Sequence, residues 1–565
     1  MQNEFKWWQS AVFYQIYPRS FADGNGDGIG DFKGMIGKLD YLKNLGIDAV
    51  WLSPHYPSPN VDCGYDISDY IGVAPEYGTL NEFKQFLEGL HKRNIKLVLD
   101  LVMNHTSNQH PWFIESKSSL DNPKREWYIW KKGMNGNPPN DWYSTFGGSA
   151  WEFDPQTDEY YYHFFFKEQP DLNWRNPAVK QAIFDSARFW LELGVDGFRL
   201  DAVGTLFEDE RYLDHGVKES QYELYHKENS NPSEEEREHF SKTWEEMFRY
   251  QHDLPEVHQV MRELRRVVDE YPDRVLIGET DEIAFYGKNN DELHLNFNFP
   301  LMRTKRITAK HVFANQTERL TKLPEGAWPC NTLGNHDNSR MYSAFGDGVH
   351  NDDQARLNLL MLLTLKGTPF LYNGEEIGMS DYICADPSTF QDSSAKFAYW
   401  MSTTIFKMGE QEAAKRAAEY GRDRCRTPMQ WSAATNAGFS PEGVTTWLPV
   451  NPDYKNKVNF AEQFDDKMSL WHYYKALLTF RKSSPALQTG NFDWMDLQLA
   501  DFIAFERRQG EDIFAVFLNF SDKSTEVKMD QRWQIRFTTR RDKVEFRGKT
   551  VKFAPFTGAI VQELA

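Results

Sequence analysis

The sequence predicts an α/β fold, a (β/α)8 barrel with a small domain inserted after the third strand and an antiparallel β-sandwich at the C-terminus. Eight short apolar runs recur along the chain, and amphipathic helical patterns lie between several of them. Apolar runs without alternation are typical of parallel strands buried on both faces. Eight such strands alternating with helices indicate a TIM barrel, and a change to alternating runs near residue 491 indicates the sandwich.

The expected strands follow one another at intervals that leave room for helices. They are VFYQIYP near residue 12, IDAVWLSP from Ile47, IKLVLDLV from Ile95, VDGFRLDA from Val195, RVLIGE from Arg274, ELHLNFNF from Glu292, WPCNTLGN from Trp328 and TPFLYNG from Thr368. The stretches GMIGKLDYLKNLG and LNEFKQFLEGLHKRN place apolar residues at helical spacing. We therefore expect the barrel to comprise residues 1–103 and 175–485.

Three segments are too long for ordinary barrel loops. Residues 104–174 are rich in Gly, Pro, Asn, Trp and Tyr and are expected to form the inserted domain. The charged segment KENSNPSEEEREHFSKTWEEM, after the fourth strand, is typical of a solvated helical insertion. A further insertion is expected at about 380–430. The runs DFIAFERR and DIFAVFLNF alternate and predict a sandwich over residues 486–565.

Composition excludes several classes of protein. The 565 residues include 83 Asp and Glu against 64 Lys and Arg, a net charge of −19, which disfavours nucleic acid and anionic membranes as partners. The four cysteines form no CxxC pair, and the longest apolar run is too short for a membrane span. With no signal-peptide pattern at the N-terminus, we expect a cytoplasmic protein, a monomer or weak homo-oligomer. The aromatic content of 15% suits a sugar ligand without requiring one.

Polar residues cluster at the predicted strand ends, which in a barrel of this kind meet at one rim. They are Asp100, Asn104 and His105 after strand three, Arg199 and Asp201 on strand four, Glu279 after strand five, and Asn335, His336 and Asp337 after strand seven. Buried charge is costly, so a barrel used only as a scaffold has no reason to gather it there.

The carboxylates suit glycosidic bond cleavage, in which one group protonates the leaving oxygen and another attacks or activates water. Asp201 lies two residues from Arg199, whose charge would keep it ionised and nucleophilic. Partial burial near other carboxylates would raise the pKa of Glu279, as a general acid requires. Asp337 would hold sugar hydroxyls and stabilise a positive transition state. Each carboxylate alone is more often structural, whereas the cluster indicates an enzyme.

The same strand ends resemble the four short sequence regions of the α-amylase family, glycoside hydrolase family 13: DLVMNH, GFRLDAV, IGET and GNHD. QPDLN from Gln169 and RTPMQW from Arg426 resemble its branch of oligo-1,6-glucosidases and α-glucosidases (maltases), whose members retain anomeric configuration. The resemblance implies that Asp201 is the nucleophile, Glu279 the acid/base and Asp337 the transition-state stabiliser.

The resemblance also implies a pocket for the terminal glucose, formed by Asp62, Tyr65, His105, Arg199 and His336. An arginine of GRDRCRTPMQW should pair with Asp62 and close this pocket; we favour Arg422, with Arg426 as the alternative. Phe146 and Phe166 would line its apolar wall, although ordinary core packing accounts for them equally well. A pocket closed at one end favours release of one glucose from a non-reducing end.

The segment DGNGDGIGD places oxygen ligands at every second residue, as in the first part of an EF-hand loop, but has no Glu at the twelfth position. The spacing alone leaves a metal and an ordinary turn equally open. The family resemblance implies a structural Ca or Mg ion held by Asp23, Asn25, Asp27, Asp31 and the carbonyl of Ile29. No organic cofactor is expected.

The resemblance is weakest on linkage preference. Relatives that prefer α-1,6 bonds typically have Val after the nucleophile, whereas this chain has Ala202, which resembles α-1,4-preferring or broad α-glucosidases. We therefore expect a retaining, exo-acting α-glucosidase that releases glucose from maltose, maltooligosaccharides or sucrose. The alternatives are a glucosyl transferase or isomerase (trehalose synthase- or sucrose isomerase-like) and an α-1,6-specific oligo-1,6-glucosidase. A non-catalytic binding subunit is disfavoured because all three carboxylates are present.

Overall fold

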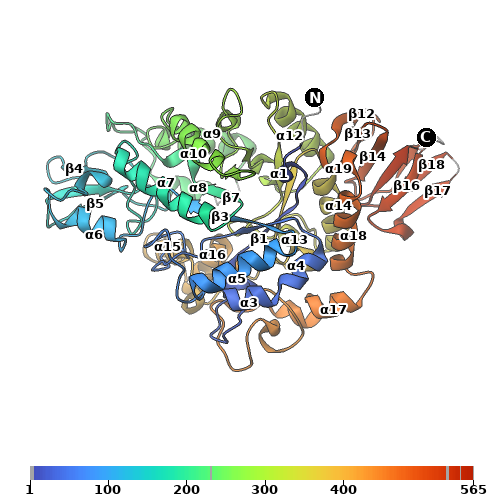
Figure 1. Ribbon diagram of the computed structural model, residues 1–565, viewed down its shortest axis with the longest axis horizontal. Coiled ribbons are helices and arrows are strands. Elements are labelled where there is room, and N and C mark those ends of the chain that lie inside the picture. The colour runs from blue at the N-terminus through green and yellow to red at the C-terminus, as the bar shows by residue number, and fades with distance from the viewer. Residues whose placement is uncertain (1–4, 229–231, 530–532, 548, 564–565) are drawn as a thin grey trace.

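The computed structural model describes residues 5–228, 232–529, 533–547 and 549–563 (Figure 1). Its largest sheet has eight parallel strands in the order β10-β11-β1-β2-β3-β7-β8-β9. They are β1 (Phe13–Ile16), β2 (Ala49–Leu52), β3 (Lys96–Val102), β7 (Gly197–Asp201), β8 (Val275–Gly278), β9 (Leu295–Asn296), β10 (Cys330–Thr332) and β11 (Thr368–Tyr372). Each falls within one of the eight predicted runs, which confirms the predicted barrel.

The barrel is nearly closed. Across the seam between β9 and β10, the side-chain amide of Asn298 donates to Asn331 Oδ1 at 3.1 Å. The interior is filled by aromatic rings, with Phe13 stacked on Phe370 at 4.4 Å and Phe297 edge-on to Phe370 at 4.9 Å. These strands are buried on both faces because helices cover the outer one.

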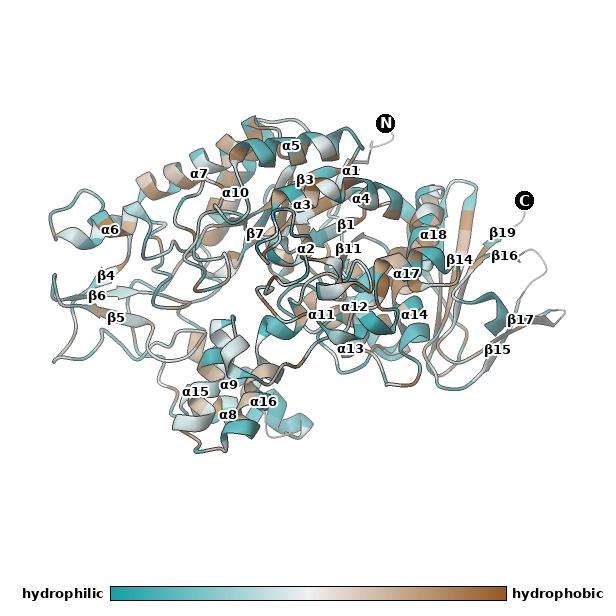
Figure 2. Ribbon diagram, turned by 90° about the horizontal axis from the view of Figure 1, so that it is seen from below, coloured by the Kyte–Doolittle hydropathy of each residue, from teal (hydrophilic) through white to brown (hydrophobic). Residues whose placement is uncertain are grey.

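The covering helices each bury one face. They include α5 (Leu80–His91), α7 (Pro177–Glu192), α10 (Val257–Asp269), α12 (Ala309–Lys322), α14 (Asn351–Thr364) and α18 (Leu470–Lys482). Helix α5 begins with a capping box, in which Thr79 and Glu82 satisfy each other's backbone amides, and it buries Phe83, Phe86 and Leu90. Hydropathy colours alternate along such helices in Figure 2, as expected for helices with one apolar stripe.

The segment between β3 and β7 carries its own sheet. Strands β4 (Trp130–Lys131), β5 (Trp151–Asp154) and β6 (Glu159–Tyr162) are antiparallel in the order β4-β6-β5, beside helix α6 (Pro111–Ser118). Trp142, Trp151 and Tyr162 form an aromatic core there. This region lies at the end of the molecule opposite the C-terminal sheets in Figure 1.

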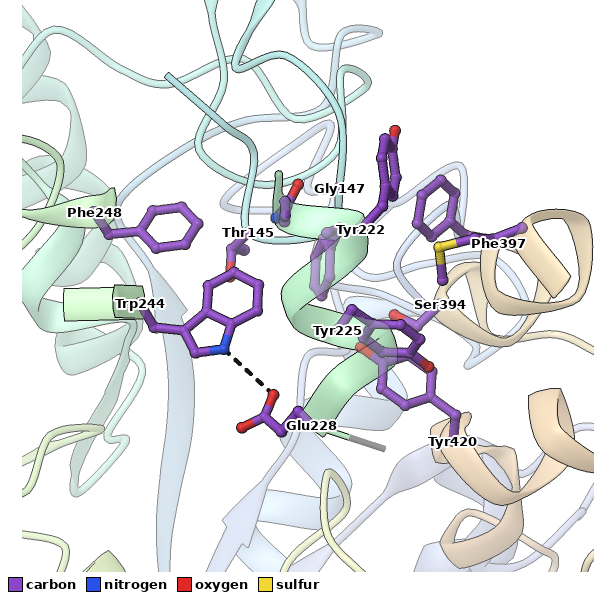
Figure 3. A pocket seen from close by; sticks show the side chains of 13 residues that line it. Thr145, Gly147, Tyr222, Tyr225, Glu228, Trp244, Phe248, Ser394, Phe397 and Tyr420 are labelled. Atoms are coloured by element: carbon purple, nitrogen blue, oxygen red, sulfur yellow. Dashed lines mark hydrogen bonds between the residues drawn. The ribbon is translucent and has the colours of Figure 1, made fainter. Parts of the chain in front are cut away.

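Two helical pairs follow β7 and β11. The first is α8 (Gln221–Glu228) and α9 (Glu234–Phe248), and the second is α15 (Ser393–Thr404) and α16 (Glu410–Tyr420). Within the predicted charged segment, residues 229–231 lie outside the described residues, and the part from Glu234 forms α9, which is mostly exposed but buries Phe240 and Met247. The two pairs lie side by side in Figure 2. They are in contact, because the rings of Tyr222 of α8 and Phe397 of α15 have centroids 6.2 Å apart (Figure 3).

The C-terminal strands form two antiparallel sheets, as predicted. One has the order β12-β13-β14-β19-β16 and the other β15-β18-β17. Their bounds are β12 (Asn491–Met495), β13 (Phe502–Gln509), β14 (Asp512–Asn519), β15 (Thr525–Lys528), β16 (Trp533–Thr538), β17 (Val544–Arg547), β18 (Thr550–Phe553) and β19 (Gly558–Glu563). Phe502, Phe517 and Phe553 pack between the sheets. On the opposite face, Phe514 contacts Phe480 of α18, which joins the sandwich to the barrel. Within the described residues, no helix is both long and apolar enough to cross a membrane.

Candidate active site

One buried arginine joins three carboxylates at the carboxyl ends of β3, β7 and β8. Arg199, on β7, has 1% of its side chain exposed. Its Nη1 lies 2.6 Å from Asp100 Oδ1 and 2.6 Å from Asp201 Oδ1, and its Nη2 lies 2.8 Å from Glu279 Oε1. The strand ends thus bring Asp201 and Glu279 to opposite arms of one guanidinium, as their positions in the sequence predict.

The residue after Asp201 adds a second link to Glu279. Ala202 has φ 44° and ψ 51°, the left-handed region that a non-glycine residue rarely adopts. This turn points its amide at Glu279, and the N–H donates to Oε2 at 2.9 Å. Arg199 therefore contacts the carboxyls of both Asp201 and Glu279, and the amide next to Asp201 binds Glu279 as well.

The two carboxyls have raised pKa values. Burial raises the pKa of Glu279 to about 8, against the charge of Arg199 and with the support of the negative Asp201 and Asp337. A quarter of its side-chain surface, 25%, remains open to the pocket. Burial also raises the pKa of Asp201, with Arg199 opposing it. At neutral pH, Glu279 is therefore mostly protonated and able to donate a proton.

Asp337 has the opposite character. Burial disfavours its charge, but His336, Arg426 and Arg422 together lower its pKa below the usual range. Burial keeps His336 itself uncharged, so the arginines provide the positive charge. Arg426 Nη2 lies 2.5 Å from Asp337 Oδ1, and Arg422 Nη1 lies 3.4 Å away. Asp337 is thus a permanent negative charge at the rim.

The rings of His336 and Tyr65 lie nearly parallel, 9° apart, with centroids separated by 5.4 Å. The His336 Nε2 lies 2.7 Å from the Tyr65 hydroxyl, which also donates to Asp100 Oδ2 at 3.2 Å. On the other side of the imidazole, the Gln15 amide nitrogen lies 2.7 Å from Nδ1. The Tyr65 and His336 rings are therefore fixed from both sides.

Asp62 is paired with Arg422. Arg422 Nη2 lies 2.6 Å from Asp62 Oδ1 and 2.7 Å from Asp392 Oδ1. Arg426 instead contacts Asp337 and donates to the carbonyl of His336 at 2.8 Å. Asp62 and Arg422 come from loops after β2 and β11, so this pair closes one side of the rim. Asp392 is absent from the predicted residues, because nothing in its local pattern marks a partner thirty residues away.

His105 follows β3 and faces a residue that the prediction omitted. The Gln169 amide nitrogen lies 2.9 Å from His105 Nε2 and donates to Asp62 Oδ2 at 3.2 Å. Burial lowers the pKa of His105 to about 3, so it is a neutral hydrogen-bonding group. Gln169 lies in the QPDLN stretch, which was the available signal.

Phe146 and Phe166 stand together at the edge of the rim rather than in a core. Their rings stack with centroids 4.1 Å apart, and both residues are half-buried. The Arg422 guanidinium lies 5.6 Å from the Phe146 ring. The pair thus forms an apolar wall next to the Asp62–Arg422 contact.

The Asp23–Asp31 loop is held by its own hydrogen bonds. Asp23 accepts from the amides of Gly26 and Gly28, at 2.6 and 2.9 Å, and Asp31 caps helix α3 (Phe32–Gly37). Asn25 donates to Asp27 at 3.0 Å. Gly28 has φ +96°, and a Cβ there would lie 2.1 Å from the carbonyl of Thr445. In the described parts of the chain, no group of three or more His, Cys, Asp and Glu side chains is arranged to hold a metal ion.

Comparisons with known proteins identify the family of the chain. The family model described as "Alpha amylase, catalytic domain" matches residues 15–490. An oligo-1,6-glucosidase of Parageobacillus thermoglucosidasius is 41% identical over 535 residues, covering 92% of this chain and 91% of that protein. An alpha-glucosidase of Pediococcus pentosaceus is 37% identical and covers 88% of each chain. The isomaltulose synthase structure from Protaminobacter rubrum superposes with a TM-score of 0.85 at 34% identity, covering 99% of this chain and all of that one. The chain therefore belongs to the α-amylase family of glycoside hydrolases.

Proposed function

We propose that the protein is a retaining, exo-acting α-glucosidase that releases glucose from the non-reducing ends of maltose, maltooligosaccharides and sucrose. The observation that carries this proposal is the Arg199 bridge, in which one guanidinium contacts both Asp201 and a mostly protonated Glu279. The Asp62–Arg422 pair closes the rim on one side, as expected for a pocket that accepts one terminal glucose.

The proposed reaction has two displacements. Glu279 gives its proton to the glycosidic oxygen while an Asp201 oxygen attacks the anomeric carbon, so the bond to the leaving sugar breaks and a glucosyl ester forms. The Glu279 carboxylate then takes a proton from water, whose oxygen attacks the same carbon and releases Asp201. Two inversions retain the configuration.

The remaining rim residues would hold the glucose and its transition state. Asp337, kept ionised by Arg426 and Arg422, faces the positive charge that develops on the sugar ring. Tyr65 and His336 present a rigid aromatic surface, and Asp62, His105 and Arg199 present hydrogen-bonding groups to the hydroxyls. Phe146 and Phe166 would form the apolar wall beyond them.

A second candidate is a glucosyl transferase or sucrose isomerase, which would use a sugar in place of water as the acceptor. This candidate is supported by the similarity to isomaltulose and trehalulose synthase structures, with TM-scores of 0.85 and 0.86. An α-1,6-specific enzyme is a third, because several relatives are named oligo-1,6-glucosidases.

Incubation with maltose, isomaltose and sucrose, followed by chromatography of the products, separates these candidates. The hydrolase releases glucose from maltose faster than from isomaltose. Accumulation of an isomeric disaccharide from sucrose without free glucose would overturn the proposal. Isomaltose as the only cleaved disaccharide would replace it with α-1,6 specificity.

We also propose that a structural Ca or Mg ion binds the loop from Asp23 to Asp31. The support is chemical: Asp23, Asn25, Asp27, Asp31 and the Ile29 carbonyl are all hard oxygen donors at alternate positions. The side chains of Asp23 and Asp31, which accept hydrogen bonds from backbone amides in this structure, would have to turn toward the ion. Thermal unfolding with EDTA and with added Ca²⁺ or Mg²⁺ tests this, and an unchanged melting temperature would contradict it.

A cytoplasmic location and a monomeric or weakly associated state complete the proposal. The four cysteines, Cys63, Cys330, Cys384 and Cys425, are all unpaired, which suits a reducing compartment. Cell fractionation tests the location, and light scattering after gel filtration tests the oligomeric state.

A further inference from the structure

Gln15 contacts the imidazole of His336 from strand β1. Only 1% of its surface is exposed, and its side-chain Nε2 lies 2.7 Å from His336 Nδ1. The same nitrogen donates to Ser53 Oγ at 3.0 Å, whereas Oε1 has no hydrogen-bond partner among the described residues. The two protons of the amide nitrogen are therefore directed at two acceptors, the hydroxyl oxygen of Ser53 and Nδ1 of His336.

The opposite edge of the imidazole requires a proton on Nε2. Burial lowers the pKa of His336 well below its usual range, so the ring is neutral and carries one N–H. The Tyr65 hydroxyl donates its only proton to Asp100 Oδ2 at 3.2 Å, so it must accept from His336 Nε2, 2.7 Å away. Asp337 Oδ2 lies 3.3 Å from the same nitrogen and is a second acceptor. With the proton on Nε2, Nδ1 is an acceptor for the donor that Gln15 presents.

The opposite orientation of the Gln15 amide conflicts with these contacts. If Oε1 faced Nδ1, the imidazole proton would have to lie on Nδ1. The lone pair of Nε2 would then face the ionised carboxylate of Asp337, which repels it. The Tyr65 hydroxyl would also have to donate to Nε2, and Asp100 would lose a buried donor. The contacts at both edges of the ring therefore agree on the tautomer with its proton on Nε2.

The position of this proton affects two charged parts of the proposed site. On one side, the hydrogen bond from Nε2 to Tyr65 leaves the tyrosine proton for Asp100, and Asp100 shares the guanidinium of Arg199 with the proposed nucleophile. On the other side, Nε2 lies next to Asp337, the proposed transition-state stabiliser. A proton moved to Nδ1 would therefore change the surroundings of both groups at once.

We propose that Gln15 is a positioning residue, which holds His336 as the Nε2–H tautomer so that the imidazole presents a hydrogen-bond donor to the glucose site. Its effect on turnover passes through His336, because the side-chain hydrogen bonds of Gln15 within the described residues go to Ser53 and His336. This effect on turnover rests on the proposed α-glucosidase function, whereas the tautomer does not depend on it.

NMR of the full chain labelled with ¹⁵N-histidine tests the tautomer, because the protonated and the bare nitrogen of an imidazole have well-separated ¹⁵N shifts. The signals that disappear in His336→Ala belong to His336, and we expect a protonated Nε2 and a bare Nδ1. In Gln15→Met, which removes the amide at similar length, the Nδ1 signal should move toward that of a nitrogen without a hydrogen bond. Ser53→Ala removes only the other partner of the amide and should leave this signal in place. A proton on Nδ1 in the wild type, or an Nδ1 signal that Gln15→Met leaves unchanged, would overturn the proposal.

A double-mutant cycle tests whether Gln15 acts through His336. We expect Gln15→Met to lower kcat/KM on 4-nitrophenyl α-glucoside roughly tenfold, because a buried acceptor loses its donor. In the His336→Ala background the same substitution should change kcat/KM less than twofold, and Ser53→Ala should stay within twofold of the wild type. Equal losses in both backgrounds would mean that Gln15 only supports the fold, and would overturn the proposal. If the wild type cleaves no α-glucoside but gives the expected spectra, the proposed function fails while the tautomer assignment stands.

Discussion

Replacing Glu279 by Gln removes the proton donor while preserving the shape of the side chain. A group with a pKa of about 8 is about 90% protonated at pH 7 and about 10% at pH 9. We therefore expect kcat/KM of the wild type on maltose to fall about tenfold between these pH values. Glu279→Gln should lose about 10²- to 10⁴-fold on maltose, the usual contribution of a positioned general acid.

The substrate with a good leaving group distinguishes acid catalysis from a general loss of activity. 2,4-Dinitrophenol departs without a proton, so the variant should still release one equivalent of it in a rapid burst from the α-glucoside. The next step should be slow, because the base that activates water is also missing. Stopped-flow absorbance measures both phases. Glu282→Gln, an exposed carboxylate three residues away, should behave as the wild type. The acid assignment is refuted if the burst slows as much as maltose turnover, or if the wild-type profile is flat from pH 7 to 9.

Three further substitutions test the rim. Asp201→Asn should abolish turnover of maltose yet preserve glucose binding in calorimetry, and residual turnover with a normal burst would contradict its role as nucleophile. Arg422→Ala leaves the buried Asp62 and Asp392 without their shared cation, so we expect the free energy of unfolding to fall by about 3–5 kcal/mol. The melting temperature in calorimetry should be lower and the KM for maltose higher. An unchanged melting temperature would contradict this. Ala202→Val should raise the ratio of isomaltose to maltose kcat/KM and lower the melting temperature, because a β-branched residue is strained at φ 44°; a lower ratio would refute the linkage argument.

The sequence predicted best what the barrel topology determines. Parallel strands bring their carboxyl ends to one rim, so Arg199, Asp201 and Glu279 could be placed together from strand positions alone. The loop residues predicted to bind glucose, such as Asp62 and Arg422, could be paired only through the family resemblance, because 360 positions separate them in the chain. Asp392 was missed for the same reason, since only tertiary packing brings its loop to Arg422.

The pKa of Asp201 shows a different limit. Its distance of two residues from Arg199 predicts an ionised carboxylate, and the contact is present at 2.6 Å. Arg199, however, also serves Asp100 and Glu279, and burial of the three carboxylates outweighs one positive charge. The number of carboxylates on one guanidinium depends on the packing of three strands, which residue spacing cannot reveal.

The charged segment after β7 likewise contained a signal that composition hid. Phe240, Trp244 and Phe248 recur every four residues, which marks one face of a helix, within a run otherwise dominated by charge. In the structure, this face packs against α8 and the inserted domain, and Trp244 and Phe248 line a pocket beyond Phe146 (Figure 3). The charge pattern therefore predicted the exposed face of α9 but gave no information about its buried face.

Helix α15 connects the Asp62–Arg422 ion pair with the pocket beyond Phe146. Its N-cap, Asp392, binds Arg422, which in turn binds Asp62, whereas Phe397, one and a half turns later, lines this pocket between the helical pairs after β7 and β11. A shift of this helix must therefore move the Asp62–Arg422 ion pair and the aromatic wall formed by Phe397 together. The strand ends set the chemistry independently of α15, since Arg199, Asp201 and Glu279 contact one another within the barrel. Substitutions along α15 should consequently alter which glucosides are accepted without changing the relative positions of the Asp201 and Glu279 carboxyls.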